Sequence, residues 1–181
     1  FVRSSLVALA AVMAGCAAYT PRLPATAKPD AGQALVYGRF SIDTRKALLG
    51  LDGHASMGFK LKCVDGKEYL LRFFVDKPVH VIQVSPSTCS VTETVYTNVD
   101  GQIMGKKPFE GTALQNMAFK PGMAYYMGDF FATSDVRVSG YNRVQSSWRI
   151  RDIKVDYDAT TAEMRTEYPG LASVATADMA H

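Results

Sequence analysis

Short stretches in which apolar and polar residues alternate, separated by turn-forming pairs, constrain the fold of this chain most strongly. Between Met57 and Cys63 every second residue is apolar, with glycine or lysine in between. A period of two is typical of a β-strand with one face toward solvent. The pair Asp65-Gly66 follows, and this pair favours a tight hairpin turn. The sequence therefore predicts a hairpin whose first strand covers residues 57–63.

Further segments carry the same signature. We expect strands over residues 69–75, 79–84, 91–99, 123–131 and 148–157, with turns at Ser85-Pro86-Ser87, Asp100-Gly101 and Lys120-Pro121-Gly122. Residues 135–147 are polar and form either a loop or an edge hairpin, and a change of phase at Arg151-Asp152 indicates a bulge. Many short strands joined by such turns are typical of a sandwich or barrel. We expect a mainly β fold, specifically an antiparallel β-sandwich with one short C-terminal helix.

The helix is expected near residues 159–168. The sequence Thr160-Thr-Ala-Glu163 fits a capping box, in which the Thr hydroxyl and the Glu carboxylate satisfy free backbone N–H groups. Met164 and Tyr168 are four residues apart and share one face of a helix. Pro169-Gly170 ends the helix.

One motif and the sequence after the signal each resemble a known family. Phe119-Lys-Pro-Gly-Met-Ala-Tyr-Tyr126 resembles the Leu-x-Pro-Gly-x-Tyr strand start of transthyretin-like and related immunoglobulin-like sandwiches. The sequence after the signal also resembles small envelope lipoproteins that end in a Tyr-Pro-x-Leu helix stop, here Tyr168-Pro-Gly-Leu171. The resemblance implies a sandwich fold and implies no activity.

The N-terminal segment has the features of an export signal. Arg3 is followed by an uncharged apolar stretch that is shorter than the roughly 20 residues of a membrane-spanning helix. Met13-Ala-Gly-Cys16 resembles the lipobox of bacterial lipoproteins, which implies cleavage before Cys16 and acylation of this cysteine. The alternatives are an ordinary secretory signal with an incidental cysteine, or a buried N-terminal helix.

These features divide the chain into four parts. Residues 1–15 are expected to be a signal peptide that is incomplete at its start, and residues 16–32 a lipidated cysteine with a flexible tether that contains three prolines. Residues 33–171 form a single domain of ordinary size, and residues 172–181 a tail. By resemblance, Ala17 after the cysteine implies sorting to the outer membrane, where we expect the domain to face the periplasm.

The two remaining cysteines are Cys63 and Cys89. An even pair in an exported chain suggests a disulfide. The alternative is two buried free thiols, since cysteine is often fully buried.

Groups with catalytic chemistry are sparse. The sequence has three histidines, His54, His80 and His181, and it contains neither a Gly-x-Ser-x-Gly nor a phosphate-binding glycine motif. We therefore expect no enzyme, no cofactor and no metal site. Asp129 lies within an apolar strand, where it is either an acid with a shifted pKa or, as we favour, the end of a strand bonded to backbone amides.

A ligand surface is expected from aromatic and basic residues late in the chain. Tyr141, Arg143 and Trp148 are the candidates, because aromatic rings can stack on sugars. The alternative is core packing, in which aromatics bury most area. The net charge of +3 is too small and too scattered for a nucleic-acid face.

The expected function is that of a lipid-anchored envelope protein with a non-catalytic binding or accessory role. Its partners would be the membrane, through Cys16, and an envelope protein or a glycan. The first alternative is a glycan- or peptidoglycan-binding module. The second is a periplasmic hydrolase, which would need Asp129 or His80 in a concave pocket beside a second polar group.

Overall fold

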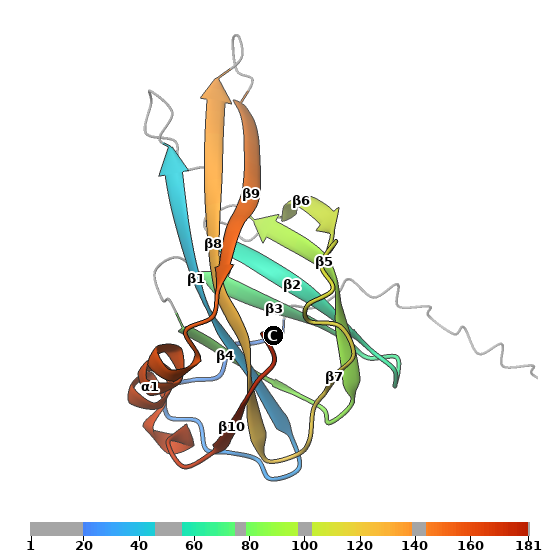
Figure 1. The fold of residues 1–181 in the computed structure, drawn as a ribbon, viewed down its shortest axis with the longest axis vertical. Coiled ribbons are helices and arrows are strands. Elements are labelled where there is room, and N and C mark those ends of the chain that lie inside the picture. The colour runs from blue at the N-terminus through green and yellow to red at the C-terminus, as the bar shows by residue number, and fades with distance from the viewer. Residues whose placement is uncertain (1–19, 46–55, 75–78, 98–102, 139–143, 181) are drawn as a thin grey trace, which may run out of the picture.

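The alternating segments of the sequence form two β-sheets, accompanied by one α-helix (Figure 1). A computed structural model describes residues 20–45, 56–74, 79–97, 103–138 and 144–180. Within these residues the strands are β1 (Ala34–Arg45), β2 (Ser56–Cys63), β3 (Glu68–Phe74), β4 (Val79–Val84), β5 (Thr88–Thr97), β6 (Ile103–Pro108), β7 (Met117–Ala118), β8 (Met123–Val138), β9 (Val144–Lys154) and β10 (Ala175–Asp178). The helix is α1 (Tyr157–Glu167), and a short 3-10 turn, η1 (Pro169–Leu171), follows it. The prediction of a mainly β fold is confirmed.

The first sheet, sheet A, contains β4, β1, β8, β9 and β10. In it, β1 and β10 both run parallel to β8, whereas β4 and β9 pair antiparallel with their neighbours. The expectation of a purely antiparallel architecture is therefore wrong. Parallel neighbours need a long crossover connection, and the strands from β2 to β7 lie in the chain between β1 and β8. Alternation within one strand carries no information about the direction of its partner.

The second sheet, sheet B, contains β3, β2, β5, β6 and β7, all in antiparallel pairs. The hairpin predicted at Asp65-Gly66 joins β2 to β3, and Gly66 has a φ of 83°, a conformation that glycine adopts without strain. The hairpin from β5 to β6 is also present as a strand pair, but Asp100 and Gly101 lie outside the described residues.

One apolar core lies between the two sheets. Phe59 of sheet B packs against Phe130 of sheet A with ring centroids 4.5 Å apart, and Phe73 contacts both of these rings. The fully buried members from β1, β2, β3 and β8 include Val36, Phe40, Met57, Phe59, Leu61, Leu71, Phe73, Met127 and Phe130. The sheets thus face each other across a continuous apolar layer, which is the largest source of stability in such an arrangement.

A second buried cluster lies on the opposite face of sheet A, beneath α1. It joins Tyr37 and Tyr126 of the sheet to Met164 of the helix, and it includes Tyr168 and Leu171 after the helix. Met164 and Tyr168 therefore share one face, as their spacing predicts. The fold has three layers in the order helix, sheet A, sheet B.

The helix begins earlier than the capping box predicts. Asp156 caps it, and its side chain accepts a hydrogen bond from the backbone N–H of Ala159. Thr160 and Thr161 are buried against sheet A instead of capping the helix. Their hydroxyls bond to side chains of the sheet, so they are not available for the free N–H groups of the helix.

The β8–β9 pair extends to Val138↔Val144, so the polar segment belongs to a hairpin rather than a loop. The register shifts between Phe131↔Asp152 and Ala132↔Ile150, which leaves one extra residue, Arg151, in β9. The predicted bulge is confirmed. In Figure 1 the ends of β1, β8 and β9 extend beyond sheet B.

Both ends of the described chain pack on the domain. In the segment 20–32, for which the sequence predicts a tether, Arg22 donates a 2.6 Å hydrogen bond to the hydroxyl of Tyr168, and the N–H of Leu23 donates to Val81. In the segment predicted as a tail, β10 pairs with β8. No described helix is long and apolar enough to cross a membrane.

Candidate functional site

A bulge in β8 determines where Asp129 points. Tyr37 pairs with Tyr126, but Arg39 pairs with Asp129, so β8 contains one residue more than β1 in this interval. Gly128 adopts a φ of 123°, which side-chain-bearing residues rarely do. In a regular strand two residues three apart face opposite sides. The bulge places Asp129 on the same side as Tyr126, toward α1.

The Asp129 carboxylate is held by the hydroxyl of Thr160 of α1, which lies 2.8 and 3.0 Å from its two oxygens. The nearby hydroxyl of Tyr126 donates to the backbone carbonyl of Lys154 at 3.5 Å. Burial raises the pKa of Asp129, and the hydroxyls of Thr160 and Tyr126 and the nearby Arg39 oppose this shift. Our preference for a strand-end carboxylate bonded to backbone amides is wrong, because Asp129 lies within β8 and its bonds go to side chains.

Asp129 lies between two cationic residues on neighbouring strands. Its register partners are Arg39 of β1 and Lys154 of β9, which form one row across sheet A. Arg39 also forms an ion pair with Glu163 of α1, with 2.6 Å between Nη2 and Oε2. Among the described residues, Lys154 makes no ion pair.

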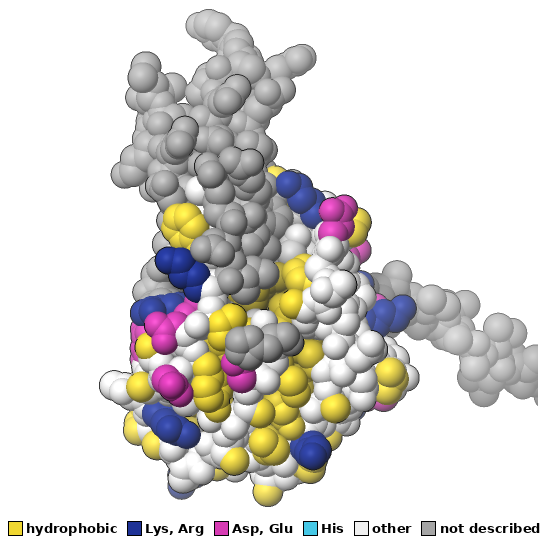
Figure 2. Space-filling model, viewed as in Figure 1, with side chains coloured by type: hydrophobic (Ala, Val, Ile, Leu, Met, Phe, Trp, Pro, Cys, Tyr) yellow, Lys and Arg dark blue, Asp and Glu magenta, His cyan; other side chains and the backbone are white. Residues whose placement is uncertain are grey.

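This row borders a cleft of about 210 Å³ on the helix side of sheet A. The cleft is lined by Arg39, Ser41, Asp129, Phe130, Phe131, Lys154 and Asp156. We call it the Asp129 cleft. At the left of Figure 2, where α1 lies in Figure 1, basic and acidic side chains gather together.

The Asp129 cleft offers both donors and acceptors of hydrogen bonds. Arg39 and Lys154 donate, while Asp129 and Asp156 accept. The condition for a hydrolase, a concave pocket with a second polar group, is met by Asp129. His80 does not meet it, because it is fully buried beside Phe73 with 5.6 Å between ring centroids.

Sheet B has a smaller hollow of about 40 Å³ on its outer face. Two of its lining residues, Lys60 and Glu68, form an ion pair with 2.8 Å between Nζ and Oε2. Each group therefore satisfies the other, and little space remains for a ligand.

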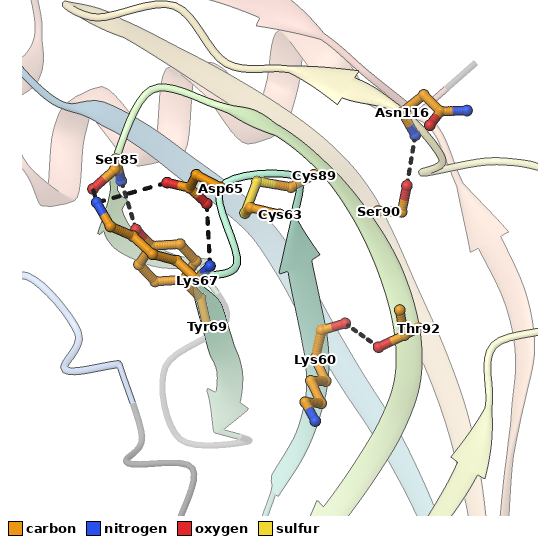
Figure 3. The surroundings of a disulfide bond; sticks show 10 residues. All are labelled: Lys60, Cys63, Asp65, Lys67, Tyr69, Ser85, Cys89, Ser90, Thr92 and Asn116. Atoms are coloured by element: carbon orange, nitrogen blue, oxygen red, sulfur yellow. Dashed lines mark hydrogen bonds and ion pairs between the residues drawn. A yellow bond between two sulfur atoms is a disulfide. The ribbon is translucent and has the colours of Figure 1, made fainter. Parts of the chain in front are cut away.

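The two cysteines Cys63 and Cys89 form a disulfide, as the sequence predicts (Figure 3). They are opposite each other at the ends of β2 and β5, and both are buried. Beside them, Lys67 at the tip of the hairpin donates to the hydroxyl of Ser85, and the N–H of Ser85 donates to the hydroxyl of Tyr69. The disulfide is therefore part of a bonded sheet end, and it leaves neither thiol for catalysis.

The other predicted site residues fall largely outside the described part of the chain. Cys16, Tyr141 and Arg143 lie outside it. Trp148 lies in β9 opposite Ser134, and its side chain is not described. Among the described residues, no group of three or more His, Cys, Asp or Glu could hold a metal ion.

Sequence reasoning missed Arg39 and Lys154. Their place beside Asp129 depends on strand register across segments that are far apart in the chain. Gly128 within an apolar strand was the one available signal, because an interior glycine often marks a bulge.

Comparisons with known proteins identify no family for this chain. No family model and no curated protein matches the chain. A solved structure from Bacteroides uniformis, described as a "putative cell adhesion protein", is similar with 17% identity and a TM-score of 0.27. The match covers 67% of this chain and 50% of the other, so the chain spans about half of that protein. A TM-score this low does not establish a shared fold.

Proposed function

We propose that this chain is an exported bacterial lipoprotein, anchored through Cys16, whose β-sandwich domain has a non-catalytic binding or accessory role. The observation that carries the proposal is the Cys63–Cys89 disulfide. Disulfides form and persist in oxidising compartments outside the cytosol. With this pair joined, Cys16 is the remaining cysteine, at the end of an apolar run that resembles a signal.

The proposed location is the outer membrane, with the domain facing the periplasm. A single acyl chain binds a membrane only marginally, whereas two or more give stable anchoring. Lipoproteins of this kind carry more than one chain, so Cys16 would be a lasting anchor. The two sheets that enclose one apolar core support the sandwich architecture within this proposal.

Metabolic labelling with a clickable fatty acid tests the anchor. The chain would be expressed in a Gram-negative host, and its label would be normalised to the protein on an immunoblot. We expect Cys16→Ala to lose the label, and the matched control Cys89→Ala to keep it. Label that persists in Cys16→Ala would contradict the proposal.

A hydrolase is the second candidate, and one observation favours it. Asp129 is a half-buried carboxylate with a raised pKa in a cleft that also contains Asp156. Groups with such perturbed pKa values are enriched at catalytic sites. Release of product from chromogenic glycoside or ester substrates, abolished in Asp129→Asn, would favour this candidate over the binding role. Equal background rates of product release in the wild type and in Asp129→Asn would exclude the hydrolase.

A further inference from the structure

We propose that the Asp129 cleft binds a neutral saccharide ring. The inference rests on the proposed binding role of the domain and is independent of the lipid anchor. It places the ligand on the helix side of sheet A, at residues other than Tyr141, Arg143 and Trp148, which the sequence suggests.

The charges of the cleft favour an uncharged ligand. Its lining contains two cations, Arg39 and Lys154, and two carboxylates, Asp129 and Asp156. A strongly anionic ligand would be repelled by the carboxylates, and a cationic ligand by the basic side chains. Sugar hydroxyls both donate and accept, so one ring can satisfy carboxylates and cations together.

The polar groups of the cleft are already fixed in position. Thr160 holds the Asp129 carboxylate, and Glu163 holds the Arg39 guanidinium. Fixed groups lose little conformational freedom when a ligand binds, which favours affinity. These two contacts from α1 therefore fix Asp129 and Arg39 in position before any ligand arrives.

The remaining wall of the cleft is partly apolar. Phe131 is half-buried and lines the cleft beside the exposed Ser41, its register partner on β1. A pyranose ring has an apolar C–H face as well as polar edges, and the electron-rich face of an aromatic ring attracts such C–H groups. A volume of about 210 Å³ is suited to one such ring and not to a polymer enclosed on all sides.

Isothermal titration calorimetry of the full chain with the tetramer of N-acetylglucosamine tests the inference. A single ring bound in an open cleft should give a Kd in the millimolar range. Loss of a hydrogen bond to a charged group weakens binding about tenfold or more, so we expect this loss in Asp129→Asn and in Lys154→Met. Lys62→Met is the matched control, because Lys62 is an exposed lysine on sheet B, and it should bind as the wild type does.

The Lys154→Met variant guards against misfolding as an explanation. Lys154 is exposed and at the end of β9, so its replacement should leave the free energy of unfolding nearly unchanged. The inference is overturned if no saturable binding occurs, if Lys154→Met and Asp129→Asn bind like the wild type, or if glucuronate binds more tightly than N-acetylglucosamine. Each of these outcomes leaves the fatty-acid test of the anchor unaffected.

Two further arms separate the sources of a neutral sugar. Sedimentation with purified sacculi would identify peptidoglycan strands, and binding to dextran would identify a general neutral polysaccharide. Sedimentation with sacculi or binding to dextran supports the inference if Lys154→Met weakens that interaction. Sedimentation that Lys154→Met does not reduce would contradict it.

Discussion

The two faces of sheet A are built on different chemistry. The face toward sheet B is apolar, with aromatic rings from both sheets in contact. The face toward α1 combines apolar packing with buried hydrogen bonds, such as the 2.6 Å bond between the hydroxyls of Tyr37 and Thr161. Asp129 and Thr160 extend this polar contact to the edge of the helix, where the cleft begins.

Because of this difference, one face contributes mainly to the stability of the fold and the other to the position of α1. Apolar burial has no preferred direction, and a core tolerates other residues if its volume is kept. Hydrogen bonds are directional, and buried polar networks favour one arrangement when all their groups are satisfied. We infer that the sheet–sheet face stabilises the fold, while the helix–sheet face fixes α1 and the cleft.

The largest expected effect comes from the sheet–sheet face. Phe59→Ala removes a fully buried ring that contacts Phe73, Phe109 and Phe130. Its free energy of unfolding should fall by about 3–5 kcal/mol in urea titrations, from lost burial and the cavity left behind. Val64→Ala, at a position that is 81% exposed, is the control and should change little. A loss below about 1 kcal/mol in Phe59→Ala would mean that this interface is not the main core.

Gly128→Ala tests the bulge that turns Asp129 toward α1. A side chain at a φ of 123° is strained, so we expect a loss of about 1–3 kcal/mol in the free energy of unfolding. The variant should also lose saccharide binding if the bulge is flattened to relieve the strain. Gly32→Ala is the comparison, because Gly32 is exposed and the nearest atom to a new Cβ there is the Asp30 side-chain oxygen at 3.3 Å. Wild-type stability in Gly128→Ala would show that Asp129 does not depend on this backbone conformation.

Tyr37→Phe removes one hydroxyl from the helix–sheet face. Because Thr161 then loses its buried partner, we expect a loss of about 1 kcal/mol, smaller than for Phe59→Ala. A double-mutant cycle with Thr161→Val measures the coupling of the two side chains. If the losses in free energy of unfolding from Tyr37→Phe and Thr161→Val are strictly additive, the hydrogen bond between these two side chains is contradicted.

Asp129→Asn should have the smallest effect on the free energy of unfolding, and this effect should depend on pH. Burial raises the pKa of Asp129, so the folded state holds the proton more tightly than the unfolded state. The contribution of this group to stability then falls as pH rises from about 4, where an unfolded Asp ionises, through the raised pKa of the folded state. Urea titrations over this window should show a weaker fall in Asp129→Asn.

The control for this pH dependence is Asp158→Asn, at an exposed position in the first turn of α1. It should keep the wild-type profile. A wild-type profile in Asp129→Asn as well would show that the Asp129 charge is not buried.

Local features of the fold could be predicted from the sequence. The hairpin at Asp65-Gly66, the bulge at Arg151 and the Cys63–Cys89 pair each depend on residues that are near in the chain or few in number. Periodicity and turn chemistry record such features directly.

The features that the sequence did not predict depend on contacts between segments far apart in the chain. The parallel pairing of β1 with β8 joins Arg39 to Asp129, and nothing within either segment encodes the direction of the other. Thr160 has a cap-like sequence, but its hydroxyl bonds across to Asp129, so tertiary contact overrides the local signal. The cleft was missed for the same reason, because its residues come from three strands and the cap of a helix.

Amide chemical shifts of the full chain, followed by NMR during titration with the N-acetylglucosamine tetramer, test the cleft most directly. The account predicts that the amides of Arg39, Asp129 and Lys154 shift together with one saturating concentration dependence. Shifts centred on Lys60 and Glu68 of sheet B, or no shifts at saturating ligand, would contradict it.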